Sequence, residues 1–159
     1  MVNFIEIKET NNKYFNEAMN IYNASFPSNE KQPVNKLRQL LEESRYQMFV
    51  GCLEKKTVFM SLIYPLKGTD FILLDYIATH RHFRKLGIGN KFIETIKTTN
   101  SNKHIIIEIE NPDHGNNKTQ KEQRIVFYKG CGFKEMKNVR YVLPPLSGNT
   151  ATEMRFGGN

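Results

Sequence analysis

The sequence predicts an α/β fold in which a mixed β-sheet of roughly six to seven strands is flanked by about four helices on both faces. Two observations support this prediction. Apolar residues recur with the strand period in some segments and with the helix period in others, in the order β-α-α-β-β-β-α-β-α-β-β. In addition, 39% of the 159 residues are hydrophobic and 11% are aromatic, which is enough to bury one sizeable core. We therefore expect a single domain spanning residues 1–159.

The N-terminal half is expected to contain an edge strand, two helices and a hairpin. Alternating apolar and polar residues predict the edge strand over residues 3–8. Apolar residues at helical spacing predict helices over 12–24 and 34–43. Two strand-like segments, 47–53 and 57–65, are separated by a short charged turn and predict an antiparallel hairpin.

The C-terminal half is expected to alternate strands and helices. Segment 71–79 is more continuously apolar than the others, which is typical of a central strand. A glycine pair separates it from a helix over about 88–99, and the alternation in 104–110 predicts another strand. The remaining expected elements are a polar loop at 111–119, a short helix at about 120–129, and strand-like segments near 132–142 and 152–156.

Composition excludes several classes of protein. No apolar run approaches the ~20 residues of a membrane-spanning helix. The N-terminus lacks the charged-then-apolar layout of a signal peptide. Two cysteines, Cys52 and Cys131, are too few for a disulfide framework or a four-thiolate metal site. We therefore expect a cytoplasmic protein that holds no metal.

The formal net charge of +7 admits three interpretations: nucleic-acid binding, binding of an anionic small ligand, or solubility alone. Basic residues are spread along the chain, but one cluster, residues 80–85, lies directly before the glycines Gly87 and Gly89. Glycines at a strand-to-helix turn let the backbone approach a ligand closely. The unpaired N–H groups of the following helix favour an anion. Arg84 and Lys85 add full charges, so a phosphate or pyrophosphate is the expected occupant.

Two common phosphate-binding motifs do not match. A dinucleotide-binding Gly-x-Gly-x-x-Gly has glycine where this chain has Phe92. A P-loop needs Gly-Lys-Ser/Thr after its spacer, and the chain has none. From the glycines alone, a tight turn without a ligand remains equally open.

Two segments together resemble motifs of the GNAT superfamily of N-acetyltransferases. In residues 76–89, Arg84, Gly87 and Gly89 match that family's acetyl-CoA-binding pattern Arg/Gln-x-x-Gly-x-Gly/Ala after a central strand. Downstream, residues 127–133 resemble its Phe-Tyr-x-x-x-Gly-Phe segment on the last helix and following strand. The expected element order agrees with that family's fold over nearly the whole chain.

The resemblance implies a fold and a cofactor site. In this family the strand before the glycine loop and the next strand diverge, and the pantetheine of acetyl-CoA hydrogen-bonds along the end of the first strand. A backbone N–H near Ala78 would then stabilise the oxyanion of the tetrahedral intermediate. The pyrophosphate would lie on the amides of residues 85–90. The implied cofactor-binding residues are Ile77, Ala78, Thr79, Arg84, Lys85, Leu86, Gly87, Ile88, Gly89 and Asn90.

The resemblance also implies catalytic groups. Tyr128 matches the family tyrosine that protonates the leaving thiolate, and a tyrosine is protonated at neutral pH. The acceptor amine must lose a proton, and three carboxylates on the two diverging strands are candidate bases: Asp75, Glu108 and Glu110. Strand alternation predicts that Asp75 shares a face with Ile77. These carboxylates have three other open interpretations: pairing with a nearby Lys or Arg, simple exposure at a strand end, and binding a cationic substrate.

The chain departs from the family pattern on its last helix. Positions where many members have Asn and Ala are Lys121 and Arg124 here. The loss of the Asn puts one pantetheine or water contact in doubt, while Arg124 is a candidate contact to CoA or substrate.

We therefore expect direct acetyl transfer from acetyl-CoA to a primary amine of a small molecule or peptide, in a ternary complex. The loop between the first two helices and the C-terminal strands should form the acceptor site, with Phe26, Glu30 and Tyr141 as candidate contacts. A non-catalytic CoA-binding or regulatory module is the alternative. Nucleic-acid binding ranks below both, because no interleaved aromatic stacking motif is present. By family analogy, a homodimer through a strand edge is also an expectation.

Overall fold

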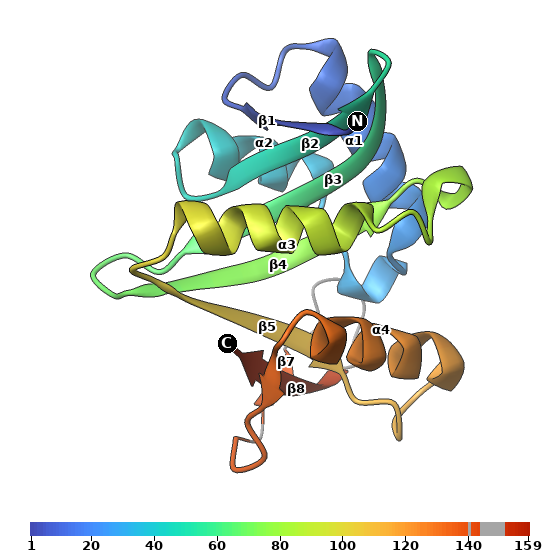
Figure 1. Ribbon diagram of the computed structural model, residues 1–159, viewed down its shortest axis with the longest axis vertical. Helices are drawn as coiled ribbons and strands as arrows, with labels where there is room; N and C mark the ends of the chain where they lie inside the picture. The colour runs from blue at the N-terminus through green and yellow to red at the C-terminus, as the bar shows by residue number, and fades with distance from the viewer. Residues whose placement is uncertain (140, 144–151) are drawn as a thin grey trace.

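The computed structural model describes residues 1–139, 141–143 and 152–159 (Figure 1). Tyr141 belongs to a strand by its backbone, but its side chain lies outside the described part, so its expected acceptor contact lies outside it too. The elements are β1 Asn3–Ile7, α1 Lys13–Ser25, η1 Ser28–Glu30, α2 Val34–Glu42, β2 Gln47–Leu53, β3 Lys56–Pro65, β4 Phe71–Thr79, η2 Arg81–Phe83, α3 Ile88–Thr99, β5 His104–Glu110, α4 Lys118–Gly130, β6 Lys134–Glu135, β7 Tyr141–Leu143 and β8 Thr152–Gly158.

The strands form one mixed sheet in the order β1-β2-β3-β4-β5-β8-β6, with β7 paired to β8. Only β4 and β5 run parallel among the described pairs. The expected edge strand is β1, and the expected central strand is β4 between β3 and β5. This confirms the predicted α/β mixed-sheet fold. The described strands number eight because the segment expected near 132–142 contains two short strands, β6 and β7, of two and three residues.

Local chemistry explains several element boundaries. Asn12 begins α1, since its side-chain oxygen accepts a hydrogen bond from the backbone N–H of Phe15 at 2.9 Å. Glu54 and Lys55 both have positive φ between the paired Leu53 and Lys56, which is the backbone of a two-residue turn whose twist suits a hairpin. The last helix, α4, begins at Lys118, inside the expected polar loop.

Helices cover both faces of the sheet (Figure 1). On one face, α1 and α2 pack their buried residues, among them Phe15, Tyr22 and Leu37, against β2 and β3. On the other face, α3 and α4 pack residues such as Phe92 and Tyr128 against β4 and β5. Isoleucines at every second position of β5 are buried, as the alternation predicted.

The parallel strands β4 and β5 stay paired for only part of their length. Their register runs from Phe71 opposite His104 to Leu74 opposite Ile107, and no pair follows it. Figure 1 shows the two strands diverging beyond this point. From residue 75 to residue 79, the edge of β4 that faces β5 therefore has no strand partner among the described residues.

A β-bulge lies at the start of this divergence. Leu74 pairs with Ile63 and Tyr76 pairs with Leu62, so Asp75 is an extra residue with no partner on β3. Tyr76 consequently packs with the α1 and α2 core, whereas Ile77 packs on the α3 side. The Asp75 carboxylate accepts a hydrogen bond from Tyr46, a member of the α1 and α2 core. The prediction that Asp75 shares a face with Ile77 was wrong, because the bulge breaks the strand alternation.

Candidate active site

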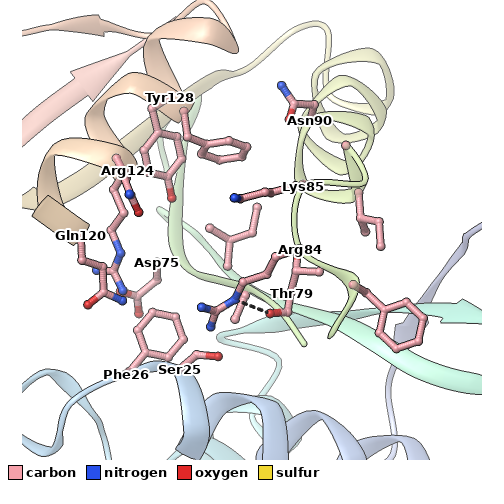
Figure 2. A pocket seen from close by; sticks show the side chains of 18 of the residues that line it. Ser25, Phe26, Asp75, Thr79, Arg84, Lys85, Asn90, Gln120, Arg124 and Tyr128 are labelled. Atoms are coloured by element: carbon pink, nitrogen blue, oxygen red, sulfur yellow. Dashed lines mark hydrogen bonds between the residues drawn. The ribbon is translucent and has the colours of Figure 1, made fainter. Parts of the chain in front are cut away.

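A cavity of about 380 Å³ opens where β4 diverges from β5, between the N-terminus of α3 and the side of α4 (Figure 2). We call it the β4–α3 cavity. Nine of the ten expected cofactor-binding residues line it: Ile77, Ala78, Thr79, Arg84, Lys85, Gly87, Ile88, Gly89 and Asn90. Leu86 does not line the cavity and is 65% exposed. Its neighbours Lys85 and Gly87, which both adopt positive φ in the turn, do line the cavity.

The glycine loop has a structural requirement for each glycine. Gly87 begins α3 with φ +71°, a left-handed conformation that costs residues with a Cβ about 1–2 kcal/mol. At Gly89, a Cβ would lie 3.0 Å from Cζ of Phe127, so this glycine allows α3 and α4 to approach closely. Arg84 donates from Nε to the carbonyl of Thr79 at 3.3 Å, and its guanidinium faces the cavity (Figure 2). The loop thus holds two cations and a helix N-terminus at one end of the cavity.

Tyr128 projects from α4 with its hydroxyl directed into the cavity (Figure 2). Its ring is 7% exposed and packs edge-on against Phe127 and Phe133. Burial raises the pKa of the phenol, with Arg124 opposing the shift, so the hydroxyl is protonated at neutral pH. No described residue donates to or accepts from this hydroxyl. It can therefore offer its proton to a group in the cavity.

A second cavity of about 380 Å³ lies on the other side of the divergence, next to η1 and α2. We call it the α2–β5 cavity. Four residues line both cavities: Phe26, Asp75, Glu108 and Arg124. Two of the expected bases and one expected acceptor contact therefore lie where the two cavities meet. The other expected acceptor contact within the described residues, Glu30, and the third candidate base, Glu110, line the α2–β5 cavity alone.

The two carboxyl groups at the junction, those of Asp75 and Glu108, have raised pKa values. Burial raises the pKa of Asp75 to about 6, although the hydrogen bond from Tyr46 opposes the shift. Burial raises the pKa of Glu108 to about 7, and the nearby Asp75 charge adds to the shift. Among the described residues, no cation lies within ion-pair distance of Glu108. A carboxylate that gains its proton near neutral pH is suited to accept one from an amine.

The other two carboxylates of the α2–β5 cavity are paired with cations on α4. Lys121 is 4% exposed, and its Nζ lies 2.6 Å from Oε1 of Glu110 and donates to the carbonyl of His114 at 2.6 Å. Glu30 lies 3.6 Å from the guanidinium of Arg124. Burial and the neighbouring Glu110 raise the pKa of Glu30, while Arg124 lowers it. These pairs join the loop before α2 and the end of β5 to α4.

Three residues of the site were not predicted in these roles. Tyr46 directly precedes β2 and looks like an ordinary core aromatic, but its hydroxyl donates to the carboxylate of Asp75. Lys121 departs from the family pattern, and its sequence context does not show that it is buried against Glu110. Arg124 was a candidate contact to a ligand, and it also packs on the ring of Phe26 with its Cζ 5.4 Å from the ring centroid. Each depends on contacts between elements far apart in the chain.

Two classes of feature are not found in the described part of the chain. In residues 1–139, 141–143 and 152–159, no group of three or more His, Cys, Asp or Glu side chains is placed to hold a metal ion. Over the same residues, the helices all fall short of the length and apolar character that crossing a membrane requires.

Solved structures share this fold. A Bacteroides thetaiotaomicron protein described as "Putative acetyltransferase from GNAT family" superposes with a TM-score of 0.83 at 19% identity, over 99% of this chain and 86% of that one. The ribosomal-protein-S18-alanine N-acetyltransferase of Escherichia coli superposes with a TM-score of 0.71 at 15% identity, over 99% and 92%. An aminoglycoside 6'-N-acetyltransferase in complex with coenzyme A gives 0.73 at 13% identity, over 99% and 96%. At these identities the likeness shows the fold.

Sequence comparison adds one curated relative and no family model. The Bacillus subtilis protein named "Putative acetyltransferase YjbC" is 32% identical over 87 residues, which is 55% of this chain. The matched segment is 43% of that protein's length, so less than half of the relative is covered. No family model matches the chain.

Proposed function

Starting from a chain that has the fold of the GNAT acetyltransferases, we propose that it transfers an acetyl group from acetyl-CoA to a primary amine. The observation that carries the proposal is the meeting of two cavities at Asp75 and Glu108. One cavity has a basic glycine loop suited to a phosphate-bearing donor, and the other contains carboxylates suited to an amine. Direct transfer in a ternary complex requires two ligands that meet at one point.

The residues of the β4–α3 cavity fit acetyl-CoA. The unpaired edge of β4 from Asp75 to Thr79 offers backbone groups to a pantetheine chain, as a missing strand would use them. Arg84, Lys85 and the N-terminus of α3 offer positive charge to a pyrophosphate. When bound, acetyl-CoA supplies an acetyl thioester, whose acyl–sulfur bond is exchanged for an acyl–nitrogen bond of the acceptor. The aminoglycoside acetyltransferase complexed with coenzyme A, which has this fold, supports the choice of donor.

We assign the proton transfers to Glu108, which lies at the junction, and to Tyr128, which lines the β4–α3 cavity. Glu108 takes a proton from the acceptor ammonium, because its pKa of about 7 leaves it partly ionised at neutral pH. Asp75, held by Tyr46, keeps a second negative charge nearby. Tyr128 donates its phenolic proton to the departing sulfur. Glu110 is a candidate base as well, but its ion pair with Lys121 favours a positioning role.

Calorimetric titration with acetyl-CoA and with free CoA tests the donor site. We expect micromolar binding to the wild-type protein. Binding to Lys85→Gln should be weaker by about tenfold or more, because a charge-assisted hydrogen bond contributes about 1.5–3 kcal/mol. Lys91→Gln is the matched control, since Lys91 is exposed on α3 and does not line the cavity. No binding at moderate salt would overturn the proposal. Equal weakening by both substitutions would show only a general effect of charge.

A further inference from the structure

Two acidic residues of the α2–β5 cavity form ion pairs with α4. When these pairs are left aside, the remaining acidic and basic side chains of the cavity lie in different parts of it. Glu110 is paired with Lys121, and Glu30 with Arg124. This leaves Asp75 and Glu108, which are half-buried at the junction with the β4–α3 cavity.

Two cations of the same cavity lie at its other end. Lys36 and Arg45 line the α2–β5 cavity and not the β4–α3 cavity, and both are exposed. The nearest ion-pair partner of Arg45 among the described residues is Glu43, at 4.0 Å on the surface. The cavity therefore has a negative inner end and a positive rim.

The wall between these ends is aromatic. The rings of Tyr46 and Tyr64 lie 5.2 Å apart, and they connect the junction to the rim, because Tyr46 donates to Asp75 and Arg45 donates to the hydroxyl of Tyr64 at 3.3 Å. The hydroxyl of Tyr76, another lining residue, donates to the carbonyl of Glu30 at 2.8 Å. Since these hydroxyls already have partners, the tyrosines present mainly their rings to the cavity.

We propose that the acceptor is a primary amine that carries a carboxylate at the far end of an apolar or aromatic spacer. This inference rests on the proposed acetyl transfer. The ammonium binds at Asp75 and Glu108, the spacer packs on the aromatic wall, and the carboxylate faces Lys36 and Arg45. A polycation would meet repulsion at the rim, and the two charged groups of an α-amino acid are bonded to one carbon, too close together to reach both ends. An amino acid with a spacer between its charges satisfies both ends of the cavity.

Matched acceptors test the inference. The probes are β-alanine, γ-aminobutyrate, ε-aminocaproate and p-(aminomethyl)benzoate. Each amino acid is compared with the amine that lacks its carboxylate and with its amide, with acetyl-CoA as the donor and thiol release as the readout. We expect at least one amino acid to have a kcat/KM about tenfold above both of its analogues. If every amine or amide equals or exceeds its amino acid, the inference is overturned in favour of a simple amine or a peptide. If acetyl-CoA binds but no amino acid is acetylated, the inference fails and the donor site stands. If acetyl-CoA does not bind, the proposed function fails as well.

Two rim variants test whether Lys36 and Arg45 bind the carboxylate of the acceptor or only support the structure. Arg45→Gln and Lys36→Gln should each raise KM for the preferred amino acid about threefold to fivefold, the range of an exposed ion pair, with kcat unchanged. KM for the matching amine should stay the same. Lys55→Gln, on the exposed β2–β3 turn, is the control and should change neither. Equal effects on amino acid and amine would contradict carboxylate recognition at the rim.

Discussion

Replacing Glu108 by Gln should stabilise the protein and abolish most of its activity. In the unfolded chain a glutamate has a pKa near 4.5, and in the folded protein burial and Asp75 raise it to about 7. A carboxyl whose pKa is raised on folding destabilises the fold once it ionises. The penalty is absent below pH 4.5, grows as the pH rises from 4.5 to 7, and is complete above pH 7.

The size of the effect follows from the shift. Each pKa unit corresponds to 1.36 kcal/mol, so the full shift is worth roughly 3 kcal/mol. Because Glu108 is half-buried and reached by solvent, screening reduces this to about 1–2 kcal/mol. Glu108→Gln removes the penalty. Its free energy of unfolding should therefore exceed that of the wild-type protein by about 1–2 kcal/mol more at pH 8 than at pH 4.5.

Urea unfolding at pH 4.5, 6 and 8 measures this difference, with Glu94→Gln on the exposed face of α3 as the control. In the same variant, kcat should fall about 10²-fold. The loss of activity that we expect for the wild-type protein below pH 7 should be absent from the variant. A pH-independent stability difference would refute the burial argument. An unchanged kcat together with a raised stability would support the burial argument and refute the role of Glu108 as the base.

Three further predictions concern α4 and the glycine loop. Tyr128→Phe should lower kcat about 10²-fold, because the variant has no phenolic proton to give to the departing sulfur. Calorimetry should find CoA binding and stability unchanged, since no described residue forms a hydrogen bond with the hydroxyl. An unchanged kcat would contradict the role of Tyr128 as the acid. Lys121→Met should lower the free energy of unfolding, measured in urea, by about 3–5 kcal/mol, because the substitution leaves Glu110 buried without its cation. Adding Glu110→Gln should restore much of the lost stability. If the double variant shows no recovery, the loss is due to packing. Gly87→Ala should cost about 1–2 kcal/mol from the positive φ alone, and Gly87→Asn less; equal losses in thermal unfolding would point to another cause.

The elements and their order could be predicted because they depend on local periodicity. The helix expected over 88–99 has those bounds in the structure, and the isoleucines of β5 are buried at alternate positions. The glycine loop could be predicted for a related reason. Its function requires adjacent residues, a strand end, a turn and a helix N-terminus, so the whole motif lies within one stretch of sequence.

The parts of the site that escaped prediction depend on register and on distant contacts. Nothing local to Asp75 shows that β3 leaves it without a partner, since a bulge is a property of two strands. Lys121 lies on a polar helix and resembles a solvated residue, and only the path of the chain before α4 places Glu110 and the His114 carbonyl around it. Tyr46 and Asp75 are 29 positions apart.

Because of the bulge at Asp75, every second residue of β4 faces one layer before the bulge and the other layer after it. Before it, Ile72 and Leu74 fill the layer beneath α3; after it, Tyr76 and Ala78 fill the layer beneath α1 and α2. Deleting Asp75 would remove a carboxylate and the bulge together, and Leu74 and Tyr76 would then follow each other in ordinary strand alternation, so both layers would keep their residues. Asp75 is therefore an extra residue that neither layer needs for its packing, and what it adds to the strand is a carboxylate where the two cavities meet.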